Sequence, residues 1–151
     1  MPKPDARAGA RIAVRLSRYV EVALAGEDLT TAQFRMLAQL DEGPDVSSSL
    51  ATKLAVSAPS VTNVVDGLVH RGLVERTHSA VDRRQVSLAL TDEGRRALER
   101  ADAAVAQRLT ELLATTGDEH LLSTLAAFRP ALDAAREARR QARLEREPVR
   151  P

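Results

Sequence analysis

Between positions 50 and 94, the spacing of apolar residues changes from the period of a helix to that of a strand. The first part carries a short apolar stripe at helical spacing, formed by Leu50, Ala51, Leu54 and Ala55. A second helical stripe follows after a short break, formed by Val61, Val64, Val65, Leu68 and Val69. Residues 73–76 and 85–90 instead alternate apolar and polar side chains, as half-buried strands do. The pattern predicts a helix, a tight turn, a second helix and two short strands.

Residues at the ends of these segments support the same boundaries. One of the serines at positions 47–49 could cap the first helix, and Ser57 is a natural N-cap for the second. Pro59 then falls in the first helical turn, where its missing N–H leaves no hydrogen bond unmade. Gly72 is expected to end this helix in a left-handed conformation, and Thr91 is expected to open another helix. Together these elements form a winged helix-turn-helix, which places one helix in a DNA major groove and a β-loop on the neighbouring backbone or minor groove.

In this order, the segments resemble the DNA-binding core of the MarR family of bacterial transcription regulators. The family's recognition helix and first wing strand resemble VSAPSVTNVVDGLVHRGLVER, residues 56–76. Its wing arginines, second strand and following helix cap resemble DRRQVSLALTDEG, residues 82–94. The helix that precedes the core in the family resembles LTTAQFRMLAQL, residues 29–40.

The resemblance implies a mainly α protein with a small β-wing. Residues 1–151 would form a single MarR-type domain, with a winged helix-turn-helix core at residues 30–95. Long N- and C-terminal helices, at residues 7–25 and 96–145, would flank this core and form the dimerisation region. Residues 146–151 would form a frayed tail.

The flanking segments carry apolar stripes at helical spacing, which a partner helix could cover. The N-terminal stripe is Ile12, Leu16, Tyr19 and Ala23. After the wing come Leu98, Ala101, Val105, Leu109 and Leu112, and beyond a break at 116–118 come Leu121, Leu125, Phe128, Leu132 and Ala135. Any single stripe could pack within the chain, but three long helices are more than the small core can cover, which favours a homodimer. Pro130 is expected to kink the last helix at its middle.

Composition narrows the classes of function. The chain has no cysteine, which excludes disulfides and thiolate metal sites. Its histidines lack metal-ligand spacing and are predicted to have surface roles: His70, His78 and His120. The sequence has no nucleophile triad, glycine-rich phosphate loop or paired carboxylates, so we expect neither an enzyme nor a cofactor. No apolar run is long enough to span a membrane, and no signal region follows the basic N-terminus, so we expect a cytoplasmic protein.

The charge balance argues against binding through a bare basic patch. The formal net charge is +1, and residues 44–95 hold six basic and six acidic side chains. Four of those basic side chains lie between Arg71 and Arg84, around the wing, and helix N-termini could bind phosphate without formal charge. The neutral core leaves open a second class of function, a winged-helix protein–protein interaction module that does not bind DNA.

The predicted recognition helix presents a small polar face with five candidate DNA-binding residues: Ser57, Pro59, Ser60, Thr62 and Asn63. The amide of Asn63 suits a bidentate contact with adenine. The hydroxyls could donate to phosphates or bases, and helix capping is the alternative, foremost for Ser57. Asp66 would repel phosphate, so pairing with a nearby arginine is favoured over reading a cytosine amino group. Gly67 could allow close approach of DNA or of another helix, and the sequence does not decide between them.

The resemblance also assigns roles within the wing. In the family, the arginine two positions after the wing aspartate enters the minor groove, which gives this role to Arg84. Asp82 would orient Arg84 through a charge-assisted hydrogen bond. Arg83 would contact a phosphate or face solvent. The alternative is a solvated salt bridge within the hairpin.

The function that the resemblance implies is a sequence-specific transcriptional regulator, a repressor. It would bind double-stranded DNA as a homodimer at a pseudo-palindromic operator and be released by a small molecule, often an aromatic or phenolic acid in this family. The chain has few aromatic residues to stack on such a ligand: Tyr19, Phe34 and Phe128. The remaining option is an apolar pocket lined by leucine, valine and Met36, with Arg15 or Arg18 to bind an anion.

Overall fold

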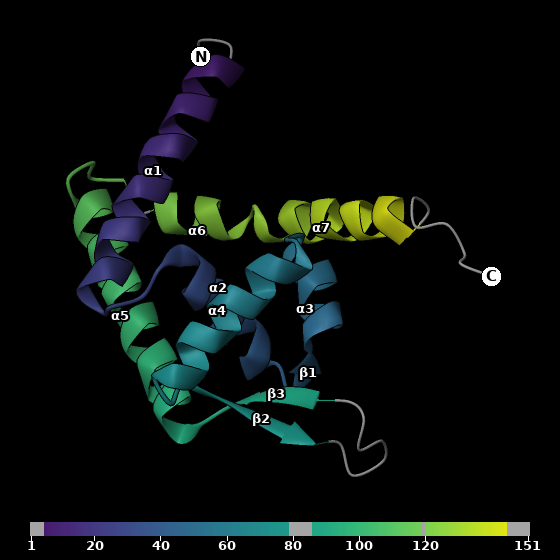
Figure 1. Ribbon diagram of the computed structural model, residues 1–151. Helices are drawn as coiled ribbons and strands as arrows, with labels where there is room; N and C mark the ends of the chain where they lie inside the picture. The colour runs from purple at the N-terminus through teal and green to yellow at the C-terminus, as the bar shows by residue number, and fades with distance from the viewer. Residues whose placement is uncertain (1–4, 79–85, 119, 145–151) are drawn as a thin grey trace.

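The computed structural model describes residues 5–78, 86–118 and 120–144 (Figure 1). Its elements in chain order are α1 (Ala6–Gly26), α2 (Thr31–Asp41), β1 (Asp45–Val46), α3 (Ser47–Leu54), α4 (Ala58–His70), β2 (Val74–His78), β3 (Val86–Leu90), α5 (Asp92–Ala114), α6 (Leu121–Ala126) and α7 (Arg129–Leu144). The predicted fold class, mainly helical with a small β-wing, is confirmed. The tail predicted for residues 146–151 lies outside the described residues.

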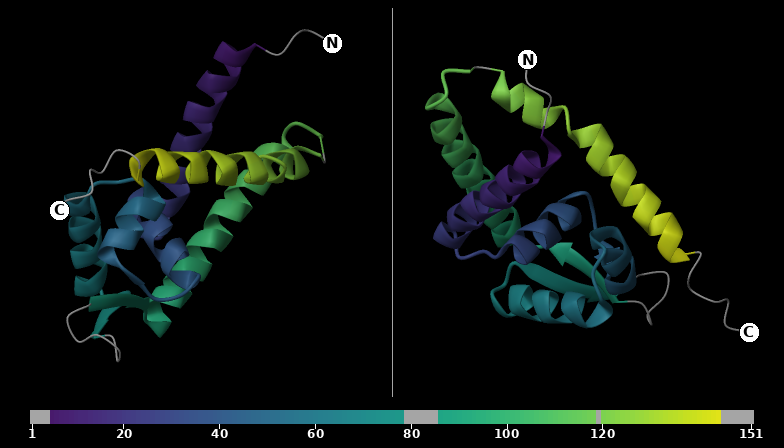
Figure 2. Two further views of the ribbon diagram at one scale, coloured as in Figure 1. Left: turned by 90° about the vertical axis from the view of Figure 1, so that its right-hand side faces the viewer. Right: turned by 90° about the horizontal axis from the view of Figure 1, so that it is seen from above.

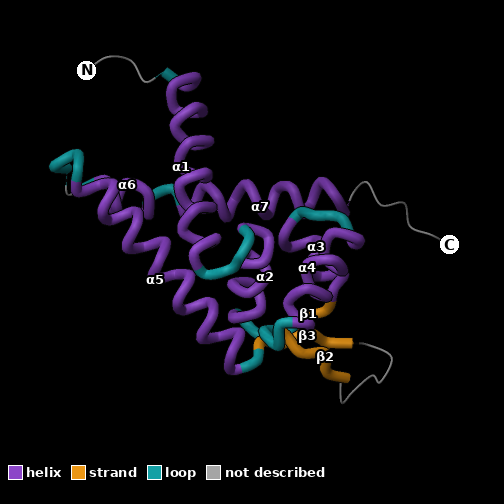
Figure 3. The backbone as a smooth tube through the Cα atoms, turned by 60° about the vertical axis from the view of Figure 1, so that its left-hand side comes forward, coloured by secondary structure: helices purple, strands orange, loops and turns teal. Residues whose placement is uncertain are grey.

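The helices divide between a central unit and a set of long flanking helices (Figures 1 and 2). Helices α2, α3 and α4 pack around the small sheet, and α5 leads away from it. Helix α1 packs against α5, and its N-terminal part projects beyond the rest of the chain (Figure 3). Helices α6 and α7 run across the molecule toward α3 (Figure 1). Within the described ranges, no helix combines the length and apolar character needed to cross a membrane.

The sheet has three antiparallel strands in the order β1-β3-β2. In the hairpin, Val74 lies opposite Leu90 and His78 lies opposite Val86, so the alternation of residues 85–90 correctly predicted β3. Strand β1, which pairs Asp45 with Leu88, was not predicted. It has only two residues, too few for an alternating pattern, and its extended conformation depends on pairing with a strand far along the chain.

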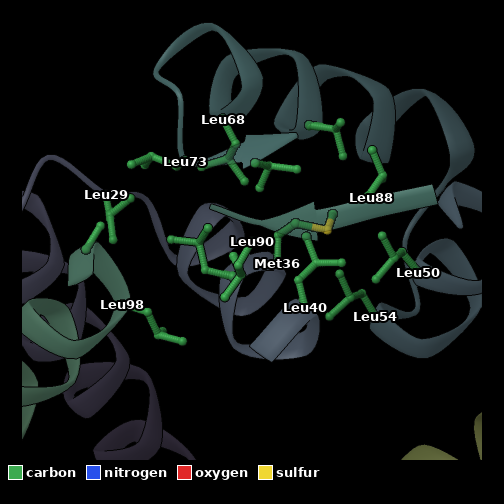
Figure 4. Packing of buried hydrophobic residues seen from close by; sticks show 14 of the residues in the cluster. Leu29, Met36, Leu40, Leu50, Leu54, Leu68, Leu73, Leu88, Leu90 and Leu98 are labelled. Carbon is green, nitrogen blue, oxygen red and sulfur yellow. The ribbon is translucent and has the colours of Figure 1, made fainter. Parts of the chain in front are cut away.

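The core joins the central unit to the base of the flanking helices (Figure 4). Leucines from six elements meet there, including Leu24 of α1, Leu68 of α4, Leu88 of β3 and Leu98 of α5. Met36, expected from the sequence to line a ligand pocket, is 1% exposed and packs within this cluster. Its thioether fills the core because α2 turns it toward the sheet, away from the face that carries Phe34.

Most predicted helix ends are confirmed. Ser57 caps α4, Thr91 caps α5, and Gly72 has a φ of +70° directly after α4. Pro130, however, does not kink a continuous helix, because α6 ends at Ala126 and α7 begins at Arg129. The proline lies in the first turn of α7, where its missing N–H breaks no hydrogen bond of that helix.

The prediction that a serine caps α3 is wrong. The helix begins at Ser47, and Val46 takes the N-cap position without a side-chain hydrogen bond. Asp45 organises this end of α3 instead, since its carboxylate accepts from the Val46 N–H at 2.8 Å and from the Ser49 hydroxyl at 3.0 Å. The ammonium of Lys53, near the other end of α3, lies 2.9 Å from the same carboxylate.

These contacts make the stability of the fold depend on the charge of Asp45. Burial by itself raises its pKa, but hydrogen bonds from Lys53, the Val46 N–H and Ser49 together lower the pKa below the ordinary aspartate value. A carboxylate with a lowered pKa stabilises the fold above its unfolded-state pKa and loses that contribution as the pH falls through its folded-state pKa.

Asp45→Asn is therefore expected to lower the free energy of unfolding at pH 7 by about 1–2 kcal/mol, since hydrogen bonds to a charged acceptor are lost. Urea unfolding of both proteins at several pH values measures the effect. The difference between the two should shrink below the ordinary pKa of aspartate. A difference that stays constant down to the most acidic pH would contradict the role given to the charge.

Candidate nucleic-acid interface

The exposed face of α4 gathers all five residues that the sequence assigned to a recognition helix. Val61, Val65 and Leu68 are buried in the core and fix the rotation of α4 about its axis. The other side of the helix carries five exposed residues: Ser57, Pro59, Ser60, Thr62 and Asn63. Their side chains are short, so a large partner could approach the backbone of α4 closely.

The hydroxyl groups on this face already form hydrogen bonds within α4 and its N-cap. Ser57 Oγ accepts from the Ser60 N–H at 3.3 Å and lies 2.8 Å from Ser60 Oγ. Thr62 Oγ1 donates to the Ala58 carbonyl oxygen at 3.1 Å. Capping by Ser57 is therefore confirmed, and each hydroxyl oxygen retains acceptor capacity. The amide of Asn63 differs from them, because it has no hydrogen-bond partner among the described residues and keeps its full set of donors and acceptors.

The N-terminus of α4 has little capacity to bind phosphate through its backbone. The Ser60 N–H donates to Ser57 Oγ, the Val61 N–H donates to the Ser57 carbonyl at 3.1 Å, and Pro59 has no N–H. Among the described contacts, only the Ala58 N–H in this first turn is without an acceptor. Most contacts to a phosphate at this end of α4 must therefore come from side chains and not from backbone N–H groups.

An ion pair ties α4 to the first strand of the wing. Arg76 of β2 donates to the carboxylate of Asp66 on α4, so the predicted pairing of Asp66 with a nearby arginine is confirmed. Both side chains are about half exposed, and a pair so exposed adds little to stability. Its consequence is geometric, because it holds a guanidinium beside the polar face of α4. Arg76 was not predicted individually as a functional residue, although it belongs to the group of basic residues from Arg71 to Arg84.

The three wing residues predicted to contact DNA, Asp82, Arg83 and Arg84, lie outside the described residues. The strands on either side of them are paired as far as His78 and Val86.

The stripes predicted for dimerisation differ in how far the chain itself covers them. Leu98 and Ala101 of α5 are buried in the core, so the first part of that stripe packs within the chain, while Val105, Leu109 and Leu112 are partly exposed. The outer stripes stay largely open, with Ile12 63%, Phe128 56% and Leu132 66% exposed. Leu125 is also exposed, Leu16 and Leu121 are partly buried, and Tyr19 is partly buried beneath the guanidinium of Arg108, 4.6 Å from its ring centre.

The structure does not bring the three predicted ligand-pocket residues together. Arg15 lines a cavity of about 310 Å³ between α1 and α5, walled by Ile12, Leu16, Tyr19 and Leu112. Arg18 is absent from this lining and pairs with Glu21 at 3.1 Å, while Met36 lies in the core. Arg15 and Arg18 are one turn apart on α1, and only Arg15 lines this cavity.

Gly67, in the middle of α4, has room for a side chain within the chain itself. A Cβ added there would lie 3.8 Å from Gln33 Nε2 of α2, an ordinary contact distance. Close packing of α2 therefore does not require glycine at this position.

Gly67→Ala is expected to raise the free energy of unfolding by up to about 1 kcal/mol, since alanine is the better helix former. Thermal unfolding measures the change, with Gly9→Ala in the exposed part of α1 as the matched control. A loss of stability would show that α2 cannot accept the added methyl group. A gain in stability together with weaker DNA binding would assign the glycine to close approach of DNA.

Comparisons with known proteins agree with this architecture. The MarR family profile matches residues 29–86. The chain is 29% identical over 111 residues to the HTH-type transcriptional repressor YetL of Bacillus subtilis, covering 72% of this chain and 66% of YetL. It is 31% identical over 103 residues to the HTH-type transcriptional regulator Mb0904 of Mycobacterium bovis, covering 68% of this chain and 72% of that protein.

A solved structure of the transcriptional repressor CouR, bound to a 23-mer DNA duplex, also matches. The TM-score is 0.64 with 39% sequence identity, and the match covers 81% of this chain and 89% of CouR. The profile match covers the central unit, from just before α2 to the first residue of β3. The structural match covers 81% of the chain and so extends into the flanking helices. By sequence and by fold, the chain belongs to the MarR family.

Proposed function

We propose that this protein is a sequence-specific DNA-binding transcriptional regulator, a repressor that acts as a homodimer on a pseudo-palindromic operator. The observation that carries the proposal is the exposed polar face of α4, where the Asn63 amide is unpaired among the described residues and its neighbours are short. The match to CouR, a repressor with a DNA-bound structure, supports the same function.

In this proposal α4 enters the major groove. Asn63 reads an adenine through the oxygen and the nitrogen of its side-chain amide. The hydroxyl groups of Ser60 and Thr62 form further hydrogen bonds with the neighbouring DNA. Asp66 keeps Arg76 beside the groove, where its guanidinium can reach a phosphate.

The homodimer is supported by the open apolar side chains of α1, α6 and α7, which exceed the scattered exposure normal for a monomer. Two copies would present two α4 helices, and half-sites about one helical turn apart would match them. Sedimentation equilibrium tests the assembly, and a monomer at micromolar concentration would contradict it.

Release by a small organic anion is the regulatory part of the proposal. The cavity beside Arg15 offers an apolar wall and one guanidinium, which suits a carboxylate on an apolar body. A ligand that binds there at free concentration L stabilises the fold by RT ln(1 + L/Kd), so the thermal midpoint rises with the logarithm of the ligand concentration once it exceeds the dissociation constant. Salicylate and a medium-chain fatty acid are suitable probes, with Arg15→Gln as the control.

The central test is selection of bound duplexes from a random pool, followed by salt titration of the best sequence. Affinity should fall linearly on logarithmic axes, with a slope of about −0.9 for each phosphate contacted. The alternative function, a protein–protein module, is favoured by the equal number of basic and acidic side chains in residues 44–95. Failure to enrich or bind any duplex would support that alternative and overturn the proposal.

Arg84→Ala is expected to weaken operator binding while the thermal midpoint and the dimer stay unchanged, because in this proposal its guanidinium enters the minor groove. Fluorescence anisotropy with a labelled duplex measures the effect. Arg83→Ala serves as the control for a general loss of charge in the wing. Equal losses in both variants would remove any special role for Arg84.

A further inference from the structure

Helix α7 touches the central unit at few points. All of its described side chains are exposed, yet the helix lies next to α3 (Figures 1 and 2). Among the described hydrogen bonds of α7 side chains, those that reach another element come from Arg136. Among these described bonds, Arg136 therefore ties the C-terminal helix to the helix-turn-helix.

The guanidinium of Arg136 bridges α3 and α2. Its Nε donates to the Lys53 carbonyl oxygen at 2.9 Å, and its Nη2 donates to Gln39 Oε1. Gln39 is 5% exposed, and its own amide donates to Glu42, so the acceptor is held in place. A charged donor on a buried, oriented acceptor is stronger than an ordinary surface contact.

The acceptor on α3 lies at the start of the turn that leads into α4. Lys53 and Leu54 are the last two residues of α3, where carbonyl groups lack donors within the helix. Arg136 donates to the first of these carbonyls, and Arg35 of α2 donates to the second at 2.9 Å. Positive charge at this end also complements the helix dipole.

The turn itself is short and strained. Ala55 has a φ of +55°, a left-handed conformation that L-residues with a side chain seldom adopt, and Ser57, the N-cap of α4, follows two residues later. Any shift of the last turn of α3 therefore passes directly to the N-terminal end of α4, which carries the proposed DNA-binding face.

We propose that Arg136 is a positioning residue, which holds the α3–α4 turn from α7 and so couples the C-terminal helices to the orientation of α4. The open apolar residues Leu125, Phe128 and Leu132 lie on α6, on α7 or between them. A change in how these helices pack in a dimer would thus shift the guanidinium of Arg136 and, with it, the turn before α4. The inference rests on the proposed DNA-binding function.

The experiment compares the full chain with Arg136→Ala, Arg136→Lys and Arg139→Ala. Arg139 is the matched control, since it lies on the same helix, is exposed and has no hydrogen bond or ion pair to a described residue. Hydrogen exchange of the amides of residues 55–57, sedimentation and affinity for the selected duplex are measured for each protein.

For Arg136→Ala, we expect exchange at residues 55–57 to be about tenfold faster and DNA affinity to be about tenfold weaker, with the dimer retained. Arg136→Lys, which keeps the charge and one donor, should recover part of both effects. Arg139→Ala should match the wild type. The slope of affinity against salt should be unchanged in Arg136→Ala, because a positioning residue contacts no phosphate.

Three results would overturn the inference. One is unchanged exchange at residues 55–57 in Arg136→Ala. Another is a fall of about one in the salt slope, which would make Arg136 a direct phosphate contact. The third is loss of the dimer with unchanged exchange at the turn. If Arg136→Ala fails to fold, the lysine variant decides by the same measurements. If the wild type binds no duplex, the proposed function fails, while the exchange measurement still tests the coupling.

Discussion

Replacing Gly94 by alanine is expected to destabilise the fold by about 3 kcal/mol, at the upper end of what one added methyl group does in a packed site. A Cβ at this position would lie 2.0 Å from the Leu73 carbonyl oxygen and 3.0 Å from its carbon, both backbone atoms. Neither atom belongs to a side chain that can rotate away, so α5 and the backbone at Leu73, just before β2, would have to separate.

The surrounding hydrogen bonds oppose that separation. Thr91 Oγ1 accepts from the Gly94 N–H at 3.0 Å and donates to the Gly72 carbonyl at 2.6 Å. The Thr91 N–H donates to the Leu73 carbonyl at 3.2 Å. The first turn of α5 is thus joined to the start of β2, and the added methyl group would disturb these bonds as well.

Urea unfolding of Gly94→Ala measures the loss. Gly9→Ala is the control, because a Cβ at Gly9 of α1 would meet no atom within 4 Å. That variant should gain about 0.5–1 kcal/mol, the usual preference for alanine over glycine in a helix. A Gly94→Ala protein as stable as the wild type would show that α5 does not pack directly on the backbone at Leu73.

Asn63→Asp is expected to give the largest loss of operator affinity from one substitution on α4. A bidentate amide–adenine contact is worth about 1–3 kcal/mol, so two half-sites lose about 2–6 kcal/mol. The new carboxylate would also lie near DNA phosphates, which repel it. Because Asn63 is exposed and unpaired among the described residues, the thermal midpoint should stay close to that of the wild type.

Asn63→Ala separates the two causes, since it removes the contact without adding charge. The difference in affinity between the alanine and aspartate variants should shrink as salt is raised, because salt screens the repulsion. The alanine variant should relax the preference at one base pair of each half-site. A uniform loss over all sequences would instead assign Asn63 to the DNA backbone.

Sequence patterns predicted the parts of this fold that depend on neighbours along the chain. The stripe from Val61 to Val69 gave the buried face of α4, and with it the exposed face that carries Asn63. Ser57, Gly72 and Thr91 gave the helix ends, because each acts on backbone groups within a few residues. The resemblance to the MarR family rested on these same local segments.

Contacts between distant segments could not be predicted in this way. Periodicity tells which face of a helix is apolar but not what will cover it, so the burial of Met36 and the chain's own coverage of the α5 stripe were decided by packing. The same holds for the two-residue strand β1 and for the pairing of Arg76 with Asp66.

By itself, then, the sequence determined the elements, their order and the polar face of the recognition helix, since these follow from local periodicity and capping. The tertiary structure decided which side chains from distant segments act on that helix. Arg76 reaches α4 from the wing, and Arg136 reaches the turn before α4 from the far end of the chain. The physical reason is that hydrogen bonds and ion pairs form over a few ångströms in space, whatever the separation along the chain.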